Sequence, residues 1–440
     1  MSSPAGVRVL ALLLCLPTLA VAQGSPTLRL TLDEAQLRAL GASHRLAEAA
    51  ARHAAALAQA GARAAAERPS VSAIVGYART NNVPEFVVPG PDGRPRVLYP
   101  NVPDNYRSRL DLQWPIYTGG RAEALERAAF AEASAVAAEG ATARADLRLE
   151  VARAFWAVVT SGAAVDVLER GVTRAQAHVA DVRQRFLAGL VPPNEIASAQ
   201  AQESRARLLL IEARNQRDVG TEELARLVGA EPGQAVEPLA TLETVTLVPP
   251  VATLIADART SRSERQVIAY RIDAADAQRA AAAAAHRPLI GVVGGVDYAR
   301  PNPRIFPRAA TWQESWDAGV QVSWSLWDGG RMAAEVAQTS NLVAAARARL
   351  ADLDSMIAVD VRQRSLEIDS GRAAIAAADD GIRAAREARR VVDERYRAGV
   401  TTHIEVLDAE FALLQAELDR TRALAGVRLA EARLGRALGR

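Results

Sequence analysis

A long stretch without proline, from Arg121 to Phe186, limits most strongly how this chain can fold. Apolar or small side chains recur in it at alternating steps of four and three: Leu147, Val151, Ala154, Val158, Ser161, Val165, Leu168, Val172, Ala175, Val179, Val182 and Phe186. Such a repeat keeps one seam facing a partner helix, as in a coiled coil. As a helix the stretch would span roughly 100 Å, so it needs partners of similar length.

The long-helix pattern returns 210 residues further on, at Ile357, Val361, Ile368, Ile375, Ile382, Val392 and Tyr396. The segment Trp324-Ser-Leu-Trp-Asp-Gly-Gly-Arg331 likewise matches Trp114-Pro-Ile-Tyr-Thr-Gly-Gly-Arg121. The sequence therefore predicts an internal duplication, with one repeat over residues 23–230 and the other over residues 251–440. Residues 231–250, rich in proline, would be the linker.

Residues 1–22 are predicted to be a secretory signal peptide. Arg8 supplies a positive charge, Val9–Leu16 a short apolar run, and Ala20-Val21-Ala22 a cleavage site. A lipoprotein would carry its lipid on Cys15, but Leu14 stands where a small residue is expected before such a cysteine. The mature chain would then lack cysteine and disulfides. No other segment has 18 consecutive apolar residues, so we expect no transmembrane helix.

Each repeat is predicted to run helix, strand, loop, strand, very long helix, tight turn, helix. The expected ranges are a helix over 31–67 capped by Thr31 and Glu34, strands over 71–80 and 106–116, and a loop over 81–105. In the second copy they are a helix over 251–285, with a break near 260–263, strands over 289–299 and 316–326, and a last helix from Thr402. Gly189 and Gly399 would end the two long helices.

The second strand of each repeat alternates between apolar and polar side chains. Tyr106, Leu110, Leu112 and Trp114 share one face, and Arg107, Arg109 and Asp111 share the other. The four strands could form a small soluble sheet, or several chains could pool them in a membrane barrel. Export, strands of about ten residues and aromatic residues at strand ends favour the membrane. The expected aromatic girdle is Tyr106, Trp114, Tyr117, Trp316, Trp324 and Trp327.

The residue inventory favours a conduit over an enzyme. His44, His53, His178, His286 and His403 are scattered without metal-ligand spacing, and no nucleotide-binding or hydrolase motif is present. We therefore expect no catalytic residues, no cofactor and no metal. The net charge of +2 gives no indication of a nucleic-acid partner.

In its duplicated order and in two tip motifs the chain resembles TolC-type outer-membrane efflux proteins. The motifs are Arg185-Phe-Leu-Ala-Gly189-Leu-Val-Pro-Pro-Asn-Glu195-Ile196 and Arg395-Tyr-Arg-Ala-Gly399-Val-Thr-Thr-His-Ile-Glu405-Val-Leu-Asp408. The resemblance implies a mainly α fold with a β-barrel part. In it, a homotrimer pools four strands per chain into one transmembrane barrel, and its long helices form a coiled-coil tunnel. It also implies an outer-membrane location in a Gram-negative bacterium, with a long periplasmic extension.

The resemblance further implies roles for residues at the helix tips. Glu405 and Asp408 would line the periplasmic entrance as carboxylate rings that favour cations, although carboxylates early in a helix also simply favour its dipole. Tyr396 would hold the entrance closed, or would be an ordinary seam aromatic. The tips would dock a periplasmic adaptor protein through Arg185, Gly189, Glu195, Arg395, Gly399 and Thr402. Pro192 replaces a small hydroxyl residue that Thr402 retains, so we expect the two tips to bind a partner unequally.

The function predicted from these features is the exit duct of a tripartite efflux pump. An inner-membrane transporter would supply the energy through the adaptor, and outer-membrane lipid would surround the barrel. Two alternatives stay open: a duct for type I protein secretion, and, from another class, a soluble periplasmic coiled-coil scaffold.

Overall fold

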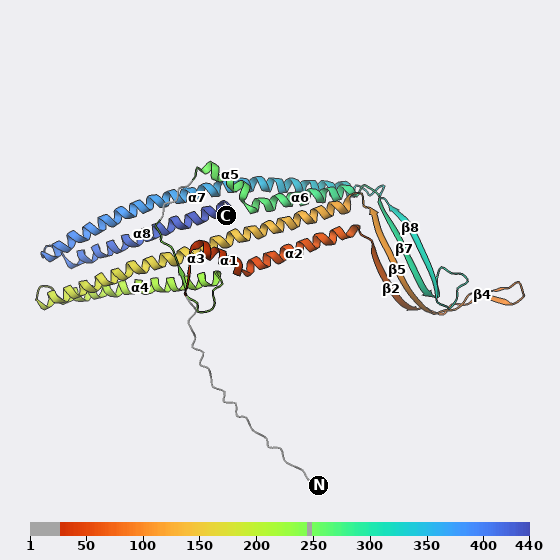
Figure 1. Cartoon of the computed structure of the whole chain (residues 1–440), viewed down its shortest axis with the longest axis horizontal. Helices are drawn as coiled ribbons and strands as arrows, with labels where there is room; N and C mark the ends of the chain where they lie inside the picture. The colour runs from red at the N-terminus through yellow and green to blue at the C-terminus, as the bar shows by residue number, and fades with distance from the viewer. Residues whose placement is uncertain (1–26, 244–248) are drawn as a thin grey trace, which may run out of the picture.

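The protein is an elongated molecule with a β-sheet at one end and two helical tips at the other (Figure 1). This computed structural model describes residues 27–243 and 249–440. The predicted signal peptide, with Cys15, lies outside the described residues, and so does part of the predicted linker.

The structure confirms the predicted order of elements in both halves. The first half contains α1 (Leu32–Ala42), α2 (His44–Ala64), β2 (Ser70–Arg79), β5 (Asp104–Tyr117), α3 (Arg121–Leu187) and α4 (Pro193–Leu227). The second contains α5 (Val251–Ser261), α6 (Ser263–Ala284), β7 (Leu289–Arg300), β8 (Gln313–Ser323), α7 (Arg331–Arg397) and α8 (His403–Ala437). The helices α3 and α7 each have 67 residues.

The structure differs from the sequence prediction in five places. The first helix is broken at Ser43, which ends α1 and caps α2; a short 3-10 turn, η1 (Ala65–Glu67), follows α2. β8 ends at Ser323, so Trp324 and Leu326 lie beyond the strand. The loop over 81–105 contains a hairpin of β3 (Phe86–Pro89) and β4 (Pro95–Tyr99). The linker contains β6 (Val236–Pro238), which pairs in parallel with β1 (Leu28–Leu30).

Helix α3 is the spine of the protomer. It packs on α4 and α8 toward the tips and on α2 and α6 toward the sheet (Figure 1). Its seam residues Val151 and Val182 are fully buried, as the repeat of four and three predicts. Phe155, which the predicted repeat does not include, is fully buried as well. One 18-residue segment of α3 is long and apolar enough to cross a bilayer, but 44% of this segment is buried inside the protomer. The buried core helices of soluble proteins have the same length and composition, so this segment is weak evidence for a membrane span.

The four main strands form one antiparallel sheet in the order β2-β5-β7-β8. Its register places Leu110 beside Val296 and Val296 beside Trp316, so these apolar side chains share one face. Arg109 lies beside Asp297 on the other face. The predicted alternation therefore holds across all neighbouring strands.

Candidate functional site

Both long helices end in the same glycine turn. At the first tip, Gly189 has φ of 71°, and the amides of Gly189 and Leu190 donate to the carbonyls of Phe186 and Arg185. At the second tip, Gly399 has φ of 75° and the same two bonds recur. This is the Schellman arrangement, which needs a left-handed residue after the helix. The turn lets α4 and α8 return alongside α3 and α7.

Behind the turns, three of the predicted tip residues meet at the seam between the two helical hairpins α3–α4 and α7–α8. The Tyr396 hydroxyl donates to Glu195 Oε2 over 3.1 Å, and Arg185 Nη1 donates to the Tyr396 carbonyl over 3.3 Å. The Arg185 guanidinium also lies 4.4 Å from the centre of the Tyr396 ring. Burial, with nearby Glu195, raises the pKa of Tyr396 to about 12, so its phenol stays a hydrogen-bond donor.

Two histidines that sequence reasoning left unassigned complete this seam. His178 on α3 and His403, the first residue of α8, stack with parallel rings whose centres lie 4.9 Å apart. His178 Nε2 and His403 Nδ1 are 3.2 Å apart and share one hydrogen bond. Only 4% of the surface of His403 is exposed. We call Arg185, Glu195, Tyr396, His178 and His403 the seam cluster.

The predicted entrance carboxylates lie apart from the seam cluster. Glu405 and Asp408 are exposed on α8 and make no hydrogen bond or ion pair within the described residues. Gly189, Arg395, Gly399 and Thr402 are also exposed at the tips. Thr402 starts α8 without a side-chain capping bond. The structure thus divides the predicted tip residues into an exposed group and the group that ties the hairpins together.

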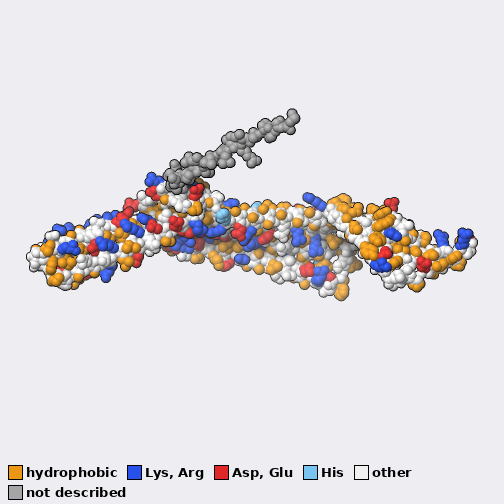
Figure 2. Space-filling view, turned by 90° about the horizontal axis from the view of Figure 1, so that it is seen from below, with side chains coloured by type: hydrophobic (Ala, Val, Ile, Leu, Met, Phe, Trp, Pro, Cys, Tyr) orange, Lys and Arg blue, Asp and Glu red, His pale blue; other side chains and the backbone are white. Residues whose placement is uncertain are grey.

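At the other end of the molecule, one face of the sheet is apolar and uncovered (Figure 2). Exposed side chains on this face include Val71, Val75, Tyr77, Leu110, Trp114, Val296, Trp316, Val320 and Val322. Val75 and Trp316 are 80% and 75% exposed. Soluble proteins rarely leave so large an apolar surface open to water.

The predicted girdle residues are exposed near this face, and the structure adds further aromatics. Trp114, Tyr117, Trp324 and Trp327 lie at the end of the sheet near the helices. At the far end, Tyr106 contacts Tyr77 and Trp312, and Trp312 stacks on Tyr298 with ring centres 5.0 Å apart. Trp316 pairs with Val296 and lies between these two groups.

The opposite face of the sheet carries an ion network. Asp297 of β7 accepts two bonds from Arg107, at 2.6 and 2.9 Å, and a further bond from Arg109. Arg109 also bonds Asp111, at 2.6 Å, and Asp317, at 3.0 Å. The sequence placed the β5 and β8 members on a polar face but missed Asp297, the one acidic residue in β7.

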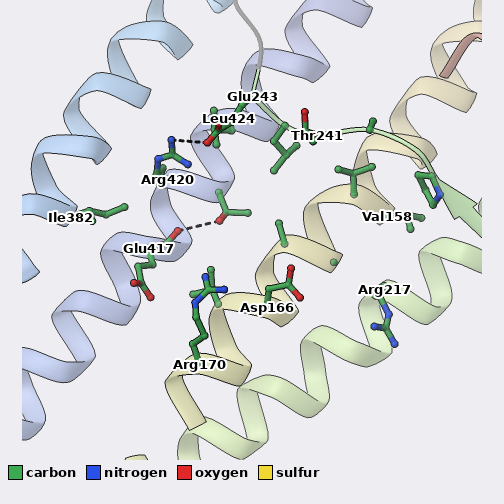
Figure 3. A pocket seen from close by; sticks show the side chains of 18 of the residues that line it. Val158, Asp166, Arg170, Arg217, Thr241, Glu243, Ile382, Glu417, Arg420 and Leu424 are labelled. Carbon is green, nitrogen blue, oxygen red and sulfur yellow. Dashed lines mark hydrogen bonds and ion pairs between the residues drawn. The ribbon is translucent and has the colours of Figure 1, made fainter. Parts of the chain in front are cut away.

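Halfway along the helices, the linker crosses a wide groove of about 1370 Å³ (Figure 3). Arg420 of α8 bonds Asp379 of α7 at 2.6 Å and Glu243 of the linker at 3.1 Å. Arg420 therefore fastens the linker to the second hairpin. The groove is lined by both charge signs, among them Asp166, Arg170 and Glu417. Within the described residues, no group of three or more His, Cys, Asp or Glu side chains could hold a metal ion.

Comparisons with known proteins agree with this architecture. A family model described as outer membrane efflux protein matches residues 37–230 and 254–440. The outer membrane protein TolC of Vibrio cholerae is 23% identical over 299 residues, which are 67% of each chain. A membrane protein from Pseudomonas aeruginosa has the same fold, with a TM-score of 0.79, 20% identity and 92% coverage of both chains. The outer membrane protein VceC of Vibrio cholerae has a TM-score of 0.76, 20% identity and coverage of 93% of this chain and 96% of that one.

The class of protein is thus a channel built from a helical barrel and a β-barrel that is completed by trimerisation. This chain belongs to the outer membrane efflux protein family. It is an outer-membrane protein with an elongated periplasmic helical part. The uncovered apolar face of its sheet has the character of a lipid-facing barrel surface.

Proposed function

We propose that this chain forms the exit duct of a tripartite efflux pump and passes small molecules from the periplasm to the exterior. One arrangement carries the proposal. A single protomer joins a lipid-facing sheet to helices α3 and α7, which reach roughly 100 Å away from it. Three copies contribute twelve strands, which are enough to enclose a channel.

A periplasmic adaptor would meet the duct at the helical tips. Leu187, Leu190, Val400 and Ile404 are apolar and exposed around the two glycine turns. Apolar side chains gathered at the end of a molecule are a common feature of partner-binding surfaces. Through the adaptor, the inner-membrane transporter supplies the energy for export.

The seam cluster would hold the entrance closed. Glu405 and Asp408 would select ions at the entrance. The seam cluster joins the two hairpins of one protomer through hydrogen bonds of Tyr396 with Glu195 and Arg185. Threefold symmetry would repeat the two exposed carboxylates as rings, and acidic rings favour cations.

Conductance and export together test the proposal. The purified trimer should conduct in a planar bilayer, and deletion of the gene should sensitise cells to small toxic compounds. Loss of a secreted protein with unchanged resistance would assign the duct to type I secretion instead. A protein that fractionates as soluble and does not conduct would overturn the duct and leave the scaffold.

A further inference from the structure

The His178–His403 contact can exist only in some protonation states. Each neutral imidazole has one N–H and one bare nitrogen, so one ring donates and the other accepts over the 3.2 Å between Nε2 and Nδ1. When both rings are protonated, both facing nitrogens carry a proton, and the bond is lost. Two like charges would then face each other across stacked rings.

The surroundings of His403 give a second reason why its charged form is disfavoured. Its Nε2 is buried and has no hydrogen-bond partner within the described residues. An imidazolium carries an N–H at both ring nitrogens, so a protonated His403 would bury a charged donor without an acceptor. Movement of His403 into water removes this cost.

We propose that the His178–His403 hydrogen bond is a proton-sensitive clasp that ties the two hairpins of a protomer together at neutral pH and releases them on acidification. The residues lie 225 positions apart, on α3 and on α8, so releasing the bond removes one tie between the hairpin α3–α4 and the hairpin α7–α8 and loosens their contact. The Tyr396–Glu195 bond and the ion pairs of Arg174 with Glu410 and Glu417 still join them. The proposal rests on the proposed function in one respect: the structure that opens is the entrance of the duct.

The sign of the pH effect follows from the two histidines. Burial, together with the neighbouring His403, lowers the pKa of His178, and burial lowers the pKa of His403. The clasped state therefore binds fewer protons than a state with both rings in water. Its full stabilisation is present above about pH 6.5, the ordinary histidine pKa, and is lost as pH falls from there toward the lowered values.

Other charged groups around the pair modify its titration without reversing it. Asp181 and Asp393 raise the pKa of His178, while Arg185 lowers it, and Glu195 raises the pKa of His403. These are smaller effects than burial for both rings. The further titratable or charged groups beside the pair are Tyr396 on α7, Arg174 on α3 and Glu410 on α8.

Single-channel recording with acidification of the tip-side compartment alone tests the clasp. From about pH 7.5 to about pH 5.5 the open-to-closed ratio of the wild type should rise about tenfold or more, since each unit of pKa difference is worth up to about tenfold. The double variant His178→Gln/His403→Asn keeps neutral hydrogen-bonding groups and cannot titrate. Its ratio should change less than about twofold. The control His44→Gln, in an exposed residue of α2, should behave as the wild type does.

A permanent positive charge at position 178 gives a second test, in which the channel should open without acidification. His178→Lys should raise the open-to-closed ratio at neutral pH, where the clasp should hold the wild type closed, and should flatten its response to acid. A native gel confirms that each variant is a trimer, and His403→Asn alone replaces the double variant if that one does not assemble. An unchanged acid response in the neutral variants, or a closed His178→Lys channel, would overturn the clasp. A wild type that never conducts would overturn the duct itself.

Discussion

The Tyr396 hydroxyl, in the last turn of α7, donates a 3.1 Å hydrogen bond to Glu195, in the first turn of α4. The two residues are 201 positions apart in sequence, and their bond joins the hairpin α3–α4 to the hairpin α7–α8. If the duct opens by separating these hairpins at the tip, as we propose, the bond opposes opening.

Tyr396→Phe removes this bond and keeps the ring under Arg185. A hydrogen bond to a charged group contributes about 1.5–3 kcal/mol, so the open-to-closed ratio should rise roughly ten- to a hundredfold. Single-channel recording at neutral pH measures the ratio. Tyr270→Phe on α6, where the hydroxyl has no hydrogen bond within the described residues, is the matched control. Equal ratios in the two variants would show that Tyr396 is only a packed aromatic.

Replacing Glu405 and Asp408 together by alanine should lower cation selectivity and weaken block by multivalent cations. The reason is that both carboxylates are exposed and unpaired within the described residues, so they can act on ions in the entrance. Trimer stability should change little, because a charge near a helix start contributes only about 0.3–1 kcal/mol. Reversal potentials in a salt gradient measure the selectivity. Unchanged selectivity and block would make the two residues ordinary helix-start carboxylates.

Val320→Arg should destabilise the barrel by about 2–4 kcal/mol if the site lies near the middle of the membrane, because a charge would then face lipid. Val320 lies on the uncovered apolar face of β8. The neighbouring Gln321→Arg points to the polar face and is the control. Urea unfolding in detergent or lipid compares the two. A greater cost at Gln321 would show that the faces of the sheet have been assigned the wrong way round.

Asp297→Ala should destabilise the sheet by about 3 kcal/mol, because it leaves two arginines without their shared carboxylate. The Asp297 and Arg109 side chains are 3% and 15% exposed. Glu314→Ala removes an exposed carboxylate of β8 that has no ion pair within the described residues, and should be nearly neutral. The same unfolding assay measures both, and similar values would show that the network adds no stability.

Bulky or charged residues at Gly399 should abolish export while trimers remain in the membrane, because they would obstruct the docking surface. Even Gly399→Ala should cost about 1 kcal/mol at its positive φ. Gly381→Ala, with open space around a helical glycine, is the control and should be neutral or stabilising. Adaptor cross-linking follows docking directly. Cross-links found only along the middle of α7 would place docking elsewhere.

The sequence predicted those features that depend on local periodicity. The repeat of four and three located α3, the alternation in β5 located both faces of the sheet, and glycine located both tips. The β3–β4 hairpin was missed because its proline and glycine residues read as loop. Asp297 could have been found, since an acidic residue in an apolar strand needs a partner. The histidine pair could not, because its members lie 225 residues apart and no spacing rule joins them.

The two repeats differ in sequence at the seam cluster. The ring of hairpin tips in a trimer would therefore contain two kinds of joint between neighbouring hairpins. A shift of 210 residues relates equivalent positions of the two repeats. Two members of the cluster have an identical counterpart: Glu195 matches Glu405 and Arg185 matches Arg395. The other three do not, because Tyr396 corresponds to Phe186, His403 to Pro193 and His178 to Ala388. A trimer would have six hairpins and therefore six joints between neighbouring hairpins. The three joints within protomers contain the bonds of the seam cluster. The three equivalent joints between protomers would lack the phenol and the imidazoles. At neutral pH the ring would therefore consist of three stiff units that move at three soft joints. Acid would make the six joints more alike, and the ring would come closer to the sixfold symmetry that the repeated sequence suggests.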